Sequence, residues 1–472
     1  MNFGQIWRYV PDDVLVFLLR QGFVRDIALK NAVRQLYNHF VVVNEENWPV
    51  GIQEVRYKLV RNLLLTLDKA FSEGRISQSV CKSLVRNLIG MTIMGEKERT
   101  EQCGFFPPAL LTISPTQRCN LMCKGCYAAS SSGTFGTLKF EIFDRIISEA
   151  KELWRAHLTV ISGGEPLLYR DGEKTLFNIL ERHRDNYFMM YTNGTLISRE
   201  TARRMAEVGN ISPAISVEGF EKQTDARRGK GVFRKIDRAM DNLRKEGVPF
   251  GVSVTATREN ADLVLSDELI DHYFQEKGAF YGWVFQYMPI GRSYTVDLMV
   301  TPDQRRAMFM REQEVVNNRQ LFLVDFWNGG PYSLGCISAG RRYFYIDWNG
   351  NIAPCVFFPY YLANIYDLYG QNKTLNDVLF SPYFESIRKW QDEYGYDRRP
   401  DRVKNWIVPC LIRDHYEEAY KLMNEFHVKP MDAEAGQALQ DEDYRKKMIE
   451  YGNRAREMTQ EIWDREFLKN RH

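Results

Sequence analysis

Three cysteines stand close together in the segment SPTQRCNLMCKGCYAAS, residues 114–130. Cys119, Cys123 and Cys126 follow one another in the spacing C-x3-C-x2-C, with no fourth cysteine or histidine beside them. A flexible turn at this spacing can fold three thiolates onto one face of a metal centre. A structural zinc site normally has four ligands in two paired knuckles, whereas three cysteines on an iron–sulfur cluster leave one iron open. The segment therefore predicts an iron–sulfur site whose open iron can bind and activate a ligand.

Short apolar runs alternate with amphipathic stretches between residues 109 and 289, and these elements must position the cysteine loop. The expected strands are 109–114, 158–162, 187–192, 211–217, 250–257 and 281–288, and the expected helices lie near 139–154, 173–184, 198–208, 233–246 and 262–277. Six such units imply a parallel sheet, either doubly wound or curled into a partial barrel. Ligands of these folds bind at the carboxyl ends of the strands, and the cysteine loop follows the first expected strand.

The cysteine loop and the repeated units together resemble the radical S-adenosylmethionine (SAM) superfamily. Its hallmark is C-x3-C-x2-C in the loop after the first strand of a partial (β/α)6 barrel, and the resemblance covers about residues 109–290. It implies an α/β fold with a partial TIM-like barrel, in which Cys119, Cys123 and Cys126 hold a catalytic [4Fe–4S] cluster that binds SAM. Reductive cleavage of SAM would give a 5′-deoxyadenosyl radical that abstracts hydrogen from an unactivated C–H bond. An oxygen-sensitive enzyme and a flavodoxin- or ferredoxin-type electron donor are implied as well.

The segment SGGEP after the second expected strand is similar to the GGEP element of this family, which holds the amino group of SAM. The matching residues are Gly163, Gly164, Glu165 and Pro166. The glycines would let the backbone come close to the cofactor, and Glu165 would add charge. On its own, such a turn is also a tight strand exit.

Further cofactor contacts are implied by the same resemblance. Asn193 of TNGT matches the turn after the third strand, although a simple Asn-Gly turn explains it nearly as well. Ser216 and Glu218 of ISVEG match an SxDG element, with Glu in place of the commoner Asp. Arg228 matches the arginine whose guanidinium group binds the SAM carboxylate through two hydrogen bonds. The alternative is that this Arg- and Lys-rich segment is simply a charged stretch exposed to solvent. Tyr127 matches the aromatic residue that borders the adenine.

A second group of cysteines lies beyond the barrel. Cys336, Gly350 and Cys355 resemble the C-x9–15-G-x4-C hairpin of the auxiliary-cluster SPASM and "twitch" domains, and YFYIDWNGNIAPC is itself a hairpin pattern. With Cys410 they are expected to hold one auxiliary [4Fe–4S] cluster, whose fourth iron is capped by Asp414 or His415 or left free for substrate. Zinc on the same ligands is the competing interpretation. The remaining cysteines, Cys81 and Cys103, are expected in the core or on the surface.

The first hundred residues have a helical pattern. The clearest case is 54–71, where an apolar stripe recurs every four residues beside basic side chains. Packing against other helices is the favoured interpretation of the stripe, and binding to a membrane surface is the alternative. The expected organisation is a helical N-terminal domain, the barrel, a small auxiliary-cluster domain and a charged, solvated helical tail, at 1–104, 105–295, 296–425 and 426–472.

Composition and charge exclude several classes. The chain has 472 residues, 44% hydrophobic and 26% charged, as is typical of a soluble globular protein. With 63 basic and 61 acidic residues, the net charge of +2 does not favour a nucleic acid partner. Residues 1–22 lack a targeting pattern, so we expect a cytoplasmic protein, or one held at the inner membrane surface by its N-terminal helices.

The substrate is the least determined part of the prediction. The segments FWNGGP (326–331) and PC…D resemble, weakly, radical SAM enzymes that join lipid tails through C–C bonds, which makes lipid acyl chains the first candidate. The alternative is a peptide, since many auxiliary-cluster members mature ribosomally made peptides. An alternative of another class is a zinc- or cluster-binding regulatory protein without catalysis.

Overall fold

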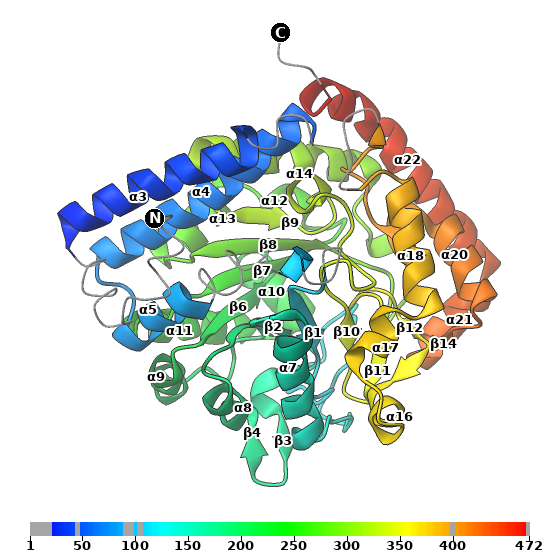
Figure 1. Cartoon of the computed structure of the whole chain (residues 1–472), viewed down its shortest axis with the longest axis horizontal. Coiled ribbons are helices and arrows are strands. Elements are labelled where there is room, and N and C mark those ends of the chain that lie inside the picture. Colours follow the sequence, from blue (N-terminus) through cyan, green and yellow to red (C-terminus); the bar gives the residue numbers. More distant parts are fainter. Residues whose placement is uncertain (1–20, 43–47, 88–98, 102–106, 397–401, 469–472) are drawn as a thin grey trace.

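The computed structural model describes residues 21–42, 48–87, 99–101, 107–396 and 402–468. Figure 1 shows a central sheet with helices α7, α8, α9 and α11 along its lower side. The N-terminal helices α3 and α4 cross the top of this view, and the C-terminal helices α18, α20 and α22 form its right-hand side.

The main sheet contains ten strands in the order β13-β11-β10-β1-β2-β5-β6-β7-β8-β9. Seven of them run parallel in chain order: β1 (Leu110–Ile113), β2 (Leu158–Ile161), β5 (Tyr187–Thr192), β6 (Ile211–Val217), β7 (Gly251–Ala256), β8 (Tyr281–Gln286) and β9 (Leu323–Asp325). The six strands expected from the sequence are confirmed. Since successive strands are neighbours and the order never reverses, the sheet is wound in one direction, as in a barrel, rather than doubly wound.

The parallel strands are buried on both faces, which explains their nearly continuous apolar sequences. In β6, every residue except Ser216 is buried. The outer face is covered by α7 (Phe140–Trp154), α8 (Leu176–Arg182), α9 (Arg199–Val208) and α11 (Val232–Lys245). Their apolar stripes pack with the strands into one large core.

One predicted helix is broken in the structure. In place of a single helix over 262–277, the chain forms α12 (Ala261–Val264), α13 (Asp267–Ile270) and a π-helical turn at 271–276. The break occurs at Ser266, whose side chain accepts a hydrogen bond from the Leu269 amide and caps a new helix.

The predicted N-terminal helix 54–71 corresponds to α4 (Val50–Ser72), between α3 (Gly22–Tyr37) and α5 (Gln78–Ser83). Its stripe is buried at Val55, Leu59 and Leu67, and the helix contacts α3 and α15 (Gly330–Ser333). Packing, rather than a membrane surface, therefore accounts for the stripe of α4. None of the helices in the described part of the chain combines the length and apolar character that a membrane span needs.

The hairpin predicted near Gly350 is present, but it belongs to the main sheet. β10 (Tyr345–Ile346) pairs antiparallel with β11 (Asn351–Ala353), which pairs with β13 (Ala363–Asn364), and Gly350 at the turn has φ of 81°. On its other edge β10 runs parallel to β1, with Thr112 opposite Tyr345. The segment expected to open a separate auxiliary domain thus extends the barrel sheet past β1.

The remaining elements lie around the sheet, and α14 contacts its β9 edge. They are β3 (Arg170–Asp171), β4 (Lys174–Thr175), α10 (Glu221–Arg228), α14 (Pro302–Glu314), β12 (Tyr360–Tyr361), α16 (Ile365–Gly370), α17 (Leu375–Leu379), α18 (Pro382–Glu393), α19 (Leu411–Asp414), α20 (Tyr416–Glu425), β14 (Lys429–Pro430), α21 (Ala433–Gln440) and α22 (Glu442–Glu466).

The prediction of a solvated C-terminal tail is wrong for α22. This helix contacts α14 and α19 and buries Met448, Ala455 and Trp463. A Cβ atom added at Gly452 would lie 2.4 Å from the Asp414 carbonyl oxygen. The buried stripe contains glycine, alanine and threonine, so its low hydrophobicity concealed a closely packed helix face.

Candidate functional site

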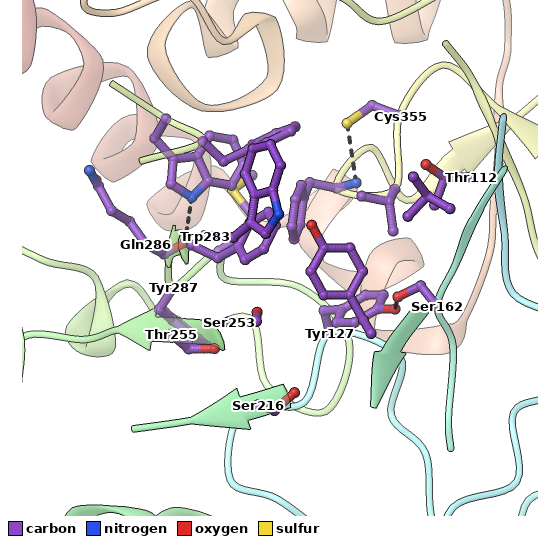
Figure 2. Close-up of a pocket in the computed structure, with 18 of the residues that line it drawn as sticks. Thr112, Tyr127, Ser162, Ser216, Ser253, Thr255, Trp283, Gln286, Tyr287 and Cys355 are labelled. Carbon is purple, nitrogen blue, oxygen red and sulfur yellow. Dashed lines mark hydrogen bonds between the residues drawn. The ribbon is translucent and has the colours of Figure 1, made fainter. Parts of the chain in front are cut away.

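A cavity of about 410 Å³ lies at the carboxyl ends of the parallel strands. It is lined by all six cysteines that the sequence singles out: Cys119, Cys123, Cys126, Cys336, Cys355 and Cys410. Figure 2 shows Tyr127 and Ser162 near the ends of the first strands, with Cys355 above them in this view. The two cysteine groups, more than 200 residues apart in the chain, thus face one space.

The first group lies in the loop after β1, as predicted. Cys119 is buried, and its sulfur accepts hydrogen bonds from the Leu121 amide at 3.4 Å and from Asn193 Nδ2 at 3.7 Å. Burial raises the pKa of the Cys119 thiol to about 11. A thiolate at such a position needs a cationic centre to stabilise it, and the donor set therefore fits a metal cluster.

The two glycines of the GGEP-like turn close against the cysteine loop itself. A Cβ atom at Gly163, whose φ is 112°, would lie 2.7 Å from the Thr116 carbonyl oxygen, and one at Gly164 would lie 2.3 Å from that of Arg118. The amides of Gly164 and Glu165 donate hydrogen bonds to those two carbonyls, each at 2.9 Å. The glycines therefore fix the cysteine loop to the exit of β2.

Glu165 is fully buried and occupied by hydrogen bonds. Its carboxylate accepts from the Thr192 hydroxyl at 2.8 Å, the Asn193 amide at 2.8 Å and the Leu167 amide at 3.2 Å. Burial raises its pKa to about 7. Glu165 thus joins the ends of β2 and β5, while Pro166 opens a single 3-10 turn. A contact between Glu165 and the amino group of SAM stays a prediction.

Glu218 and Arg228, both expected to contact SAM, form an ion pair with each other. Glu218 is 1% exposed, and its Oε1 accepts from Arg228 Nε at 2.8 Å, Arg228 Nη2 at 2.6 Å and Arg227 Nη1 at 2.5 Å. Its Oε2 is buried and has no partner within the described residues. Arg228 Nη1 lies 4.0 Å from the Cys123 sulfur, so this guanidinium lies between Glu218 and the cysteine loop.

Tyr127 connects the cysteine loop to the turn after β2. Its hydroxyl lies 2.5 Å from Ser162 Oγ and accepts a hydrogen bond from the Gly163 amide at 3.0 Å. Its ring meets that of Phe357 edge to face at 6.0 Å. Ser216, another predicted contact, lines the cavity from β6, opposite Ser253 of β7 (Figure 2).

The second cysteine group lies beside the hairpin of β10 and β11. Cys355 is buried, and its sulfur accepts hydrogen bonds from the Tyr343 hydroxyl at 2.7 Å and the Phe357 amide at 3.4 Å. Burial, and then the charges of Asp414, Cys336 and Cys355, raise the pKa of the Cys410 thiol. All three cysteines of this group line the cavity, and ligation of one cluster by them stays a prediction.

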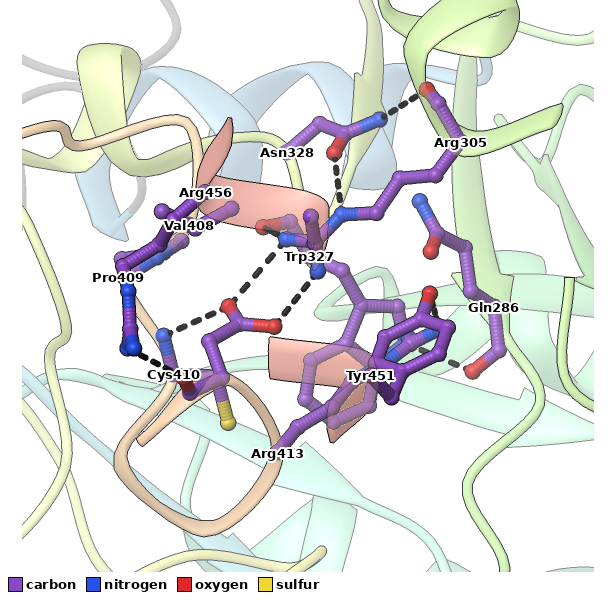
Figure 3. A network of polar contacts seen from close by, with 12 residues as sticks. Gln286, Arg305, Trp327, Asn328, Val408, Pro409, Cys410, Arg413, Tyr451 and Arg456 are labelled. Carbon is purple, nitrogen blue, oxygen red and sulfur yellow. Dashed lines mark hydrogen bonds and ion pairs between the residues drawn. The ribbon is translucent and has the colours of Figure 1, made fainter. Parts of the chain in front are cut away.

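The structure speaks against the predicted capping by Asp414 or His415. Both oxygens of Asp414 accept from the fully buried Arg305, Oδ1 at 2.5 Å from Nη1 and Oδ2 at 3.1 Å from Nη2, and Oδ2 also accepts from the Cys410 amide (Figure 3). His415 lies 2.9 Å from the Val408 carbonyl and 2.9 Å from Arg456. The polar atoms of both side chains therefore already have partners within the protein. Through these hydrogen bonds the two side chains fix the backbone around Cys410.

Arg305 was not predicted as part of the site. Its Nε donates to Asn328, and its Nη2 to the carbonyls of Trp327 and Ile407. A single arginine within a helical pattern does not indicate, from its neighbours in the sequence, that it is buried beside a functional site. Arg227 and Tyr343 were not predicted either, since their partners Glu218 and Cys355 are known only from the fold.

The cysteines of the described residues are free thiols, and within those residues no His, Cys, Asp or Glu group is arranged for a single metal ion. A [4Fe–4S] cluster binds each cysteine through a separate iron. Of the other two cysteines, Cys81 is buried among Leu67, Val80 and Leu84, as expected, and Cys103 lies outside the described residues.

Beyond the cysteines the cavity wall is mainly aromatic and aliphatic. Its apolar side chains include Leu59, Leu121, Met189, Tyr191, Trp283, Phe285, Phe322, Phe326, Trp327, Ile337, Phe357 and Phe358. Phe285, Phe326 and Phe357 form mutual ring contacts at 5.3–5.7 Å. Leu59 comes from α4, so the N-terminal helices contribute to the wall. The lining of the cavity is therefore mainly apolar, with polar side chains such as Ser253, Thr255 and Gln286 among it.

Two known families match segments that contain the first cysteine group and, from the second group, Cys336 and Cys355. Residues 113–263 match the model of the radical SAM superfamily, and residues 336–400 match SPASM, an iron–sulfur cluster-binding domain. The chain therefore contains a radical SAM domain followed by a SPASM domain, and members of this superfamily are enzymes. The first domain implies a [4Fe–4S] cluster and SAM, and the second implies auxiliary iron–sulfur clusters.

Curated relatives match over part of their length. Mycofactocin maturase MftC of Mycolicibacterium smegmatis is 29% identical over 267 residues, 54% of this chain and 66% of that protein. Fe-coproporphyrin III synthase of Methanosarcina barkeri is 30% identical over 173 residues, 36% of this chain and 43% of that protein. Sporulation killing factor maturation protein SkfB of Bacillus subtilis is 25% identical over 252 residues, 52% of this chain and 60% of that protein.

Among solved structures, SuiB of Streptococcus suis, bound to its precursor peptide SuiA, is similar in fold. The TM-score is 0.50 at 18% identity, over 71% of this chain and 83% of that chain. At this identity the likeness concerns the fold alone.

Proposed function

We propose that this chain is a radical SAM enzyme that cleaves SAM reductively and abstracts hydrogen from an unactivated C–H bond of a lipid acyl chain. Cys119, Cys123 and Cys126 hold the cluster that binds SAM, and Cys336, Cys355 and Cys410 hold one auxiliary cluster. The observation that carries this proposal is that both cysteine groups line one continuous, mainly apolar cavity.

When bound, the reduced [4Fe–4S] cluster supplies one electron to the sulfonium of SAM, which yields methionine and the 5′-deoxyadenosyl radical. The protein's own residues orient and shield the reactants. The Gly163–Gly164 turn fixes the cysteine loop, and Glu218 has one buried oxygen free to accept from a ligand hydroxyl or ammonium group. Arg228 offers Nη1 beside Cys123, where it suits a carboxylate.

The aromatic wall supports lipid acyl chains as the substrate. A radical that removes hydrogen from a saturated carbon needs that carbon held close by, and a methylene chain offers no polar handle for this. Shape and dispersion contacts with rings such as Phe285, Phe326 and Phe357 must therefore position it. Removal of one hydrogen atom from each of two such carbons, by two 5′-deoxyadenosyl radicals from two SAM molecules, would give two carbon radicals whose combination forms the C–C bond and leaves two 5′-deoxyadenosines.

Peripheral contact with a membrane is part of this proposal, because acyl chains are delivered from one. The supporting residues lie on α3 and the turn after it, where Phe23 is 79%, Val42 53% and Ile27 46% exposed. Apolar groups on an exposed helix that also carries Lys30 and Arg34 suit the surface of an anionic bilayer. Of the N-terminal aromatic residues, Trp7, Tyr9 and Phe17 lie outside the described residues, and Trp48 packs against the core beneath Arg56.

A peptide substrate is the second candidate. It is favoured by the relatives MftC and SkfB, which are named as maturation proteins. The mainly apolar wall favours a lipid, whereas a peptide backbone would have to hydrogen-bond to the smaller polar part of the lining, such as Ser253, Thr255 and Gln286.

The test is anaerobic reconstitution followed by a cleavage assay. We expect iron and sulfide for two [4Fe–4S] clusters, and 5′-deoxyadenosine when dithionite and SAM are added. Cys123→Ala should abolish this product, whereas Cys355→Ala should retain some uncoupled cleavage. Colourless protein that holds zinc at the first loop would establish the regulatory alternative.

The substrate is tested by isotope transfer. Perdeuterated acyl lipids should give deuterated 5′-deoxyadenosine, measured by mass spectrometry. Transfer from a deuterated peptide, and none from the lipid, would instead support peptide maturation.

A further inference from the structure

The outer side of the cysteine loop is exposed around Cys123. Met122 is 70% exposed, Lys124 is also exposed, and Cys123 between them is half-buried. Since consecutive Cα atoms are about 3.8 Å apart, a protein that binds Met122 and Lys124 covers the segment that contains Cys123. Cys119, in contrast, is buried.

The carboxyl end of α10 lies directly beside this part of the loop. The Lys124 amide donates to the Arg227 carbonyl at 3.0 Å, and Arg227 Nε donates to the Lys124 carbonyl at 3.2 Å. Ala226, Gly229 and Lys230 are exposed at this end of the helix. We call the exposed set Met122, Lys124, Ala226, Gly229 and Lys230 the loop face.

The loop face is cationic. Neither Lys124 nor Lys230 forms an ion pair with any residue that the structure describes. The nearby Glu218 is buried beneath the face and is held by Arg227 and Arg228. Asp225 accepts hydrogen bonds from the Gly231 and Phe233 amides, which lower its pKa, so it stays charged but its oxygens are occupied.

Glu221, at the other end of α10, is paired with Arg234. The acidic residues of this helix therefore all have partners, whereas the two lysines of the loop face are available to another protein. Met122, Ala226 and Gly229 supply the small or apolar part of the loop face.

We infer that the loop face is the docking surface of an acidic one-electron carrier protein. The inference rests on the proposed function, since each reductive cleavage of SAM consumes one electron and oxidises the carrier by one electron. Two lysines beside small and apolar residues suit a small, transient interface with a negatively charged carrier. Its place beside Cys123 gives the electron a short path to the cluster ligand.

The experiment measures reduction of the reconstituted protein by a photoreduced bacterial flavodoxin, followed by stopped-flow loss of iron–sulfur absorbance. The test variant is Lys124→Glu/Lys230→Glu. The matched control is Lys389→Glu/Lys446→Glu, which reverses two exposed lysines on α18 and α22 that have no ion pair among the described residues. Iron content and circular dichroism confirm that each variant is folded and loaded.

At low ionic strength we expect the test variant to be reduced about tenfold more slowly than the native protein, and the control to be unchanged. The difference should shrink in high salt, and reduction by dithionite should be equally fast in all three proteins. Three results would each overturn the inference. Flavodoxin could reduce the test variant as fast as the native protein, or it could reduce the control as slowly as the test variant. Dithionite could also reduce the test variant more slowly than the native protein, by the same factor as flavodoxin does.

The readout is cluster reduction and not cleavage, so the two proposals fail separately. Native protein that is reduced by flavodoxin in a charge-dependent way but forms no 5′-deoxyadenosine would overturn the proposed function and leave the docking surface established.

Discussion

Tyr343 is placed to tune the second cysteine group, because its buried hydroxyl donates to the Cys355 sulfur at 2.7 Å. Hydrogen bonds to a ligating sulfur stabilise the reduced, more negative cluster and raise its reduction potential. Tyr343→Phe should therefore lower the midpoint potential of the auxiliary cluster by roughly 20–60 mV, the equivalent of one hydrogen bond, in a redox titration followed by electron paramagnetic resonance.

Tyr345 provides the control for this prediction. It is buried two residues further along the chain, in β10, but its hydroxyl donates to Ser114 rather than to a cysteine. Tyr345→Phe should leave the auxiliary potential unchanged. If both variants shift it equally, the hydrogen bond to Cys355 is not the cause.

The Arg305–Asp414 pair should dominate local stability, because both side chains are fully buried. Removing one partner of such a pair leaves an uncompensated charge and typically costs about 3–5 kcal/mol. Arg305→Met should lower the free energy of unfolding by about this amount in urea titrations, and Arg305→Met/Asp414→Leu should recover part of the loss. A double variant no more stable than the single one would contradict the ion-pair explanation.

His415 should make stability depend on pH. Burial lowers its pKa to about 4, from 6.5 when unfolded, so between these values the unfolded chain binds more protons. The free energy of unfolding should fall by about 3 kcal/mol from pH 6.5 to 4 through this group alone.

Glu165 acts in the opposite direction, since burial raises its pKa from 4.5 to about 7 and its contribution is lost as the pH rises through that value. The effect of His415 is therefore isolated by subtraction. The difference in stability between native protein and His415→Gln should shrink steadily as the pH falls from 6.5 to 4. A constant difference would show that His415 does not titrate there.

Among the elements, α3 has an exposed apolar surface from which we predict binding to membranes. Phe23→Asp/Ile27→Asp should reduce co-flotation with anionic phospholipid vesicles severalfold, because both side chains are exposed and apolar. Val55→Asp is unsuitable as a control, since Val55 is buried. Met310→Asp, on the exposed side of α14, is the better one. Equal flotation of all proteins would exclude α3 as the membrane contact.

Element types and positions in the barrel could be predicted because each parallel strand is apolar along its length and each covering helix is amphipathic. The cysteine spacings likewise identified six cavity residues. The break at Ser266 could not be predicted, since a serine inside a helical pattern can face solvent as readily as cap a new turn. Contacts such as Arg305 with Asp414 join residues 109 positions apart, and no local pattern records them.

The pairing of β10 was also beyond local patterns. The hairpin itself follows from alternation and an Asn-Gly turn, but its partner is chosen by the open edge of β1. The charged sequence of α22 led to the wrong prediction of a solvated helix for a similar reason. Glycine and alanine at its contact face contribute little hydrophobicity to the pattern.

For the whole molecule, the strand β10 has a practical consequence. Because it is hydrogen-bonded to β1, the barrel cannot be isolated by cutting the chain before the second cysteine group. Such a fragment would present the bare backbone of β1 as a template for strands of other molecules. We expect shortened versions ending near residue 295 to form aggregates on expression, whatever the integrity of their first metal centre.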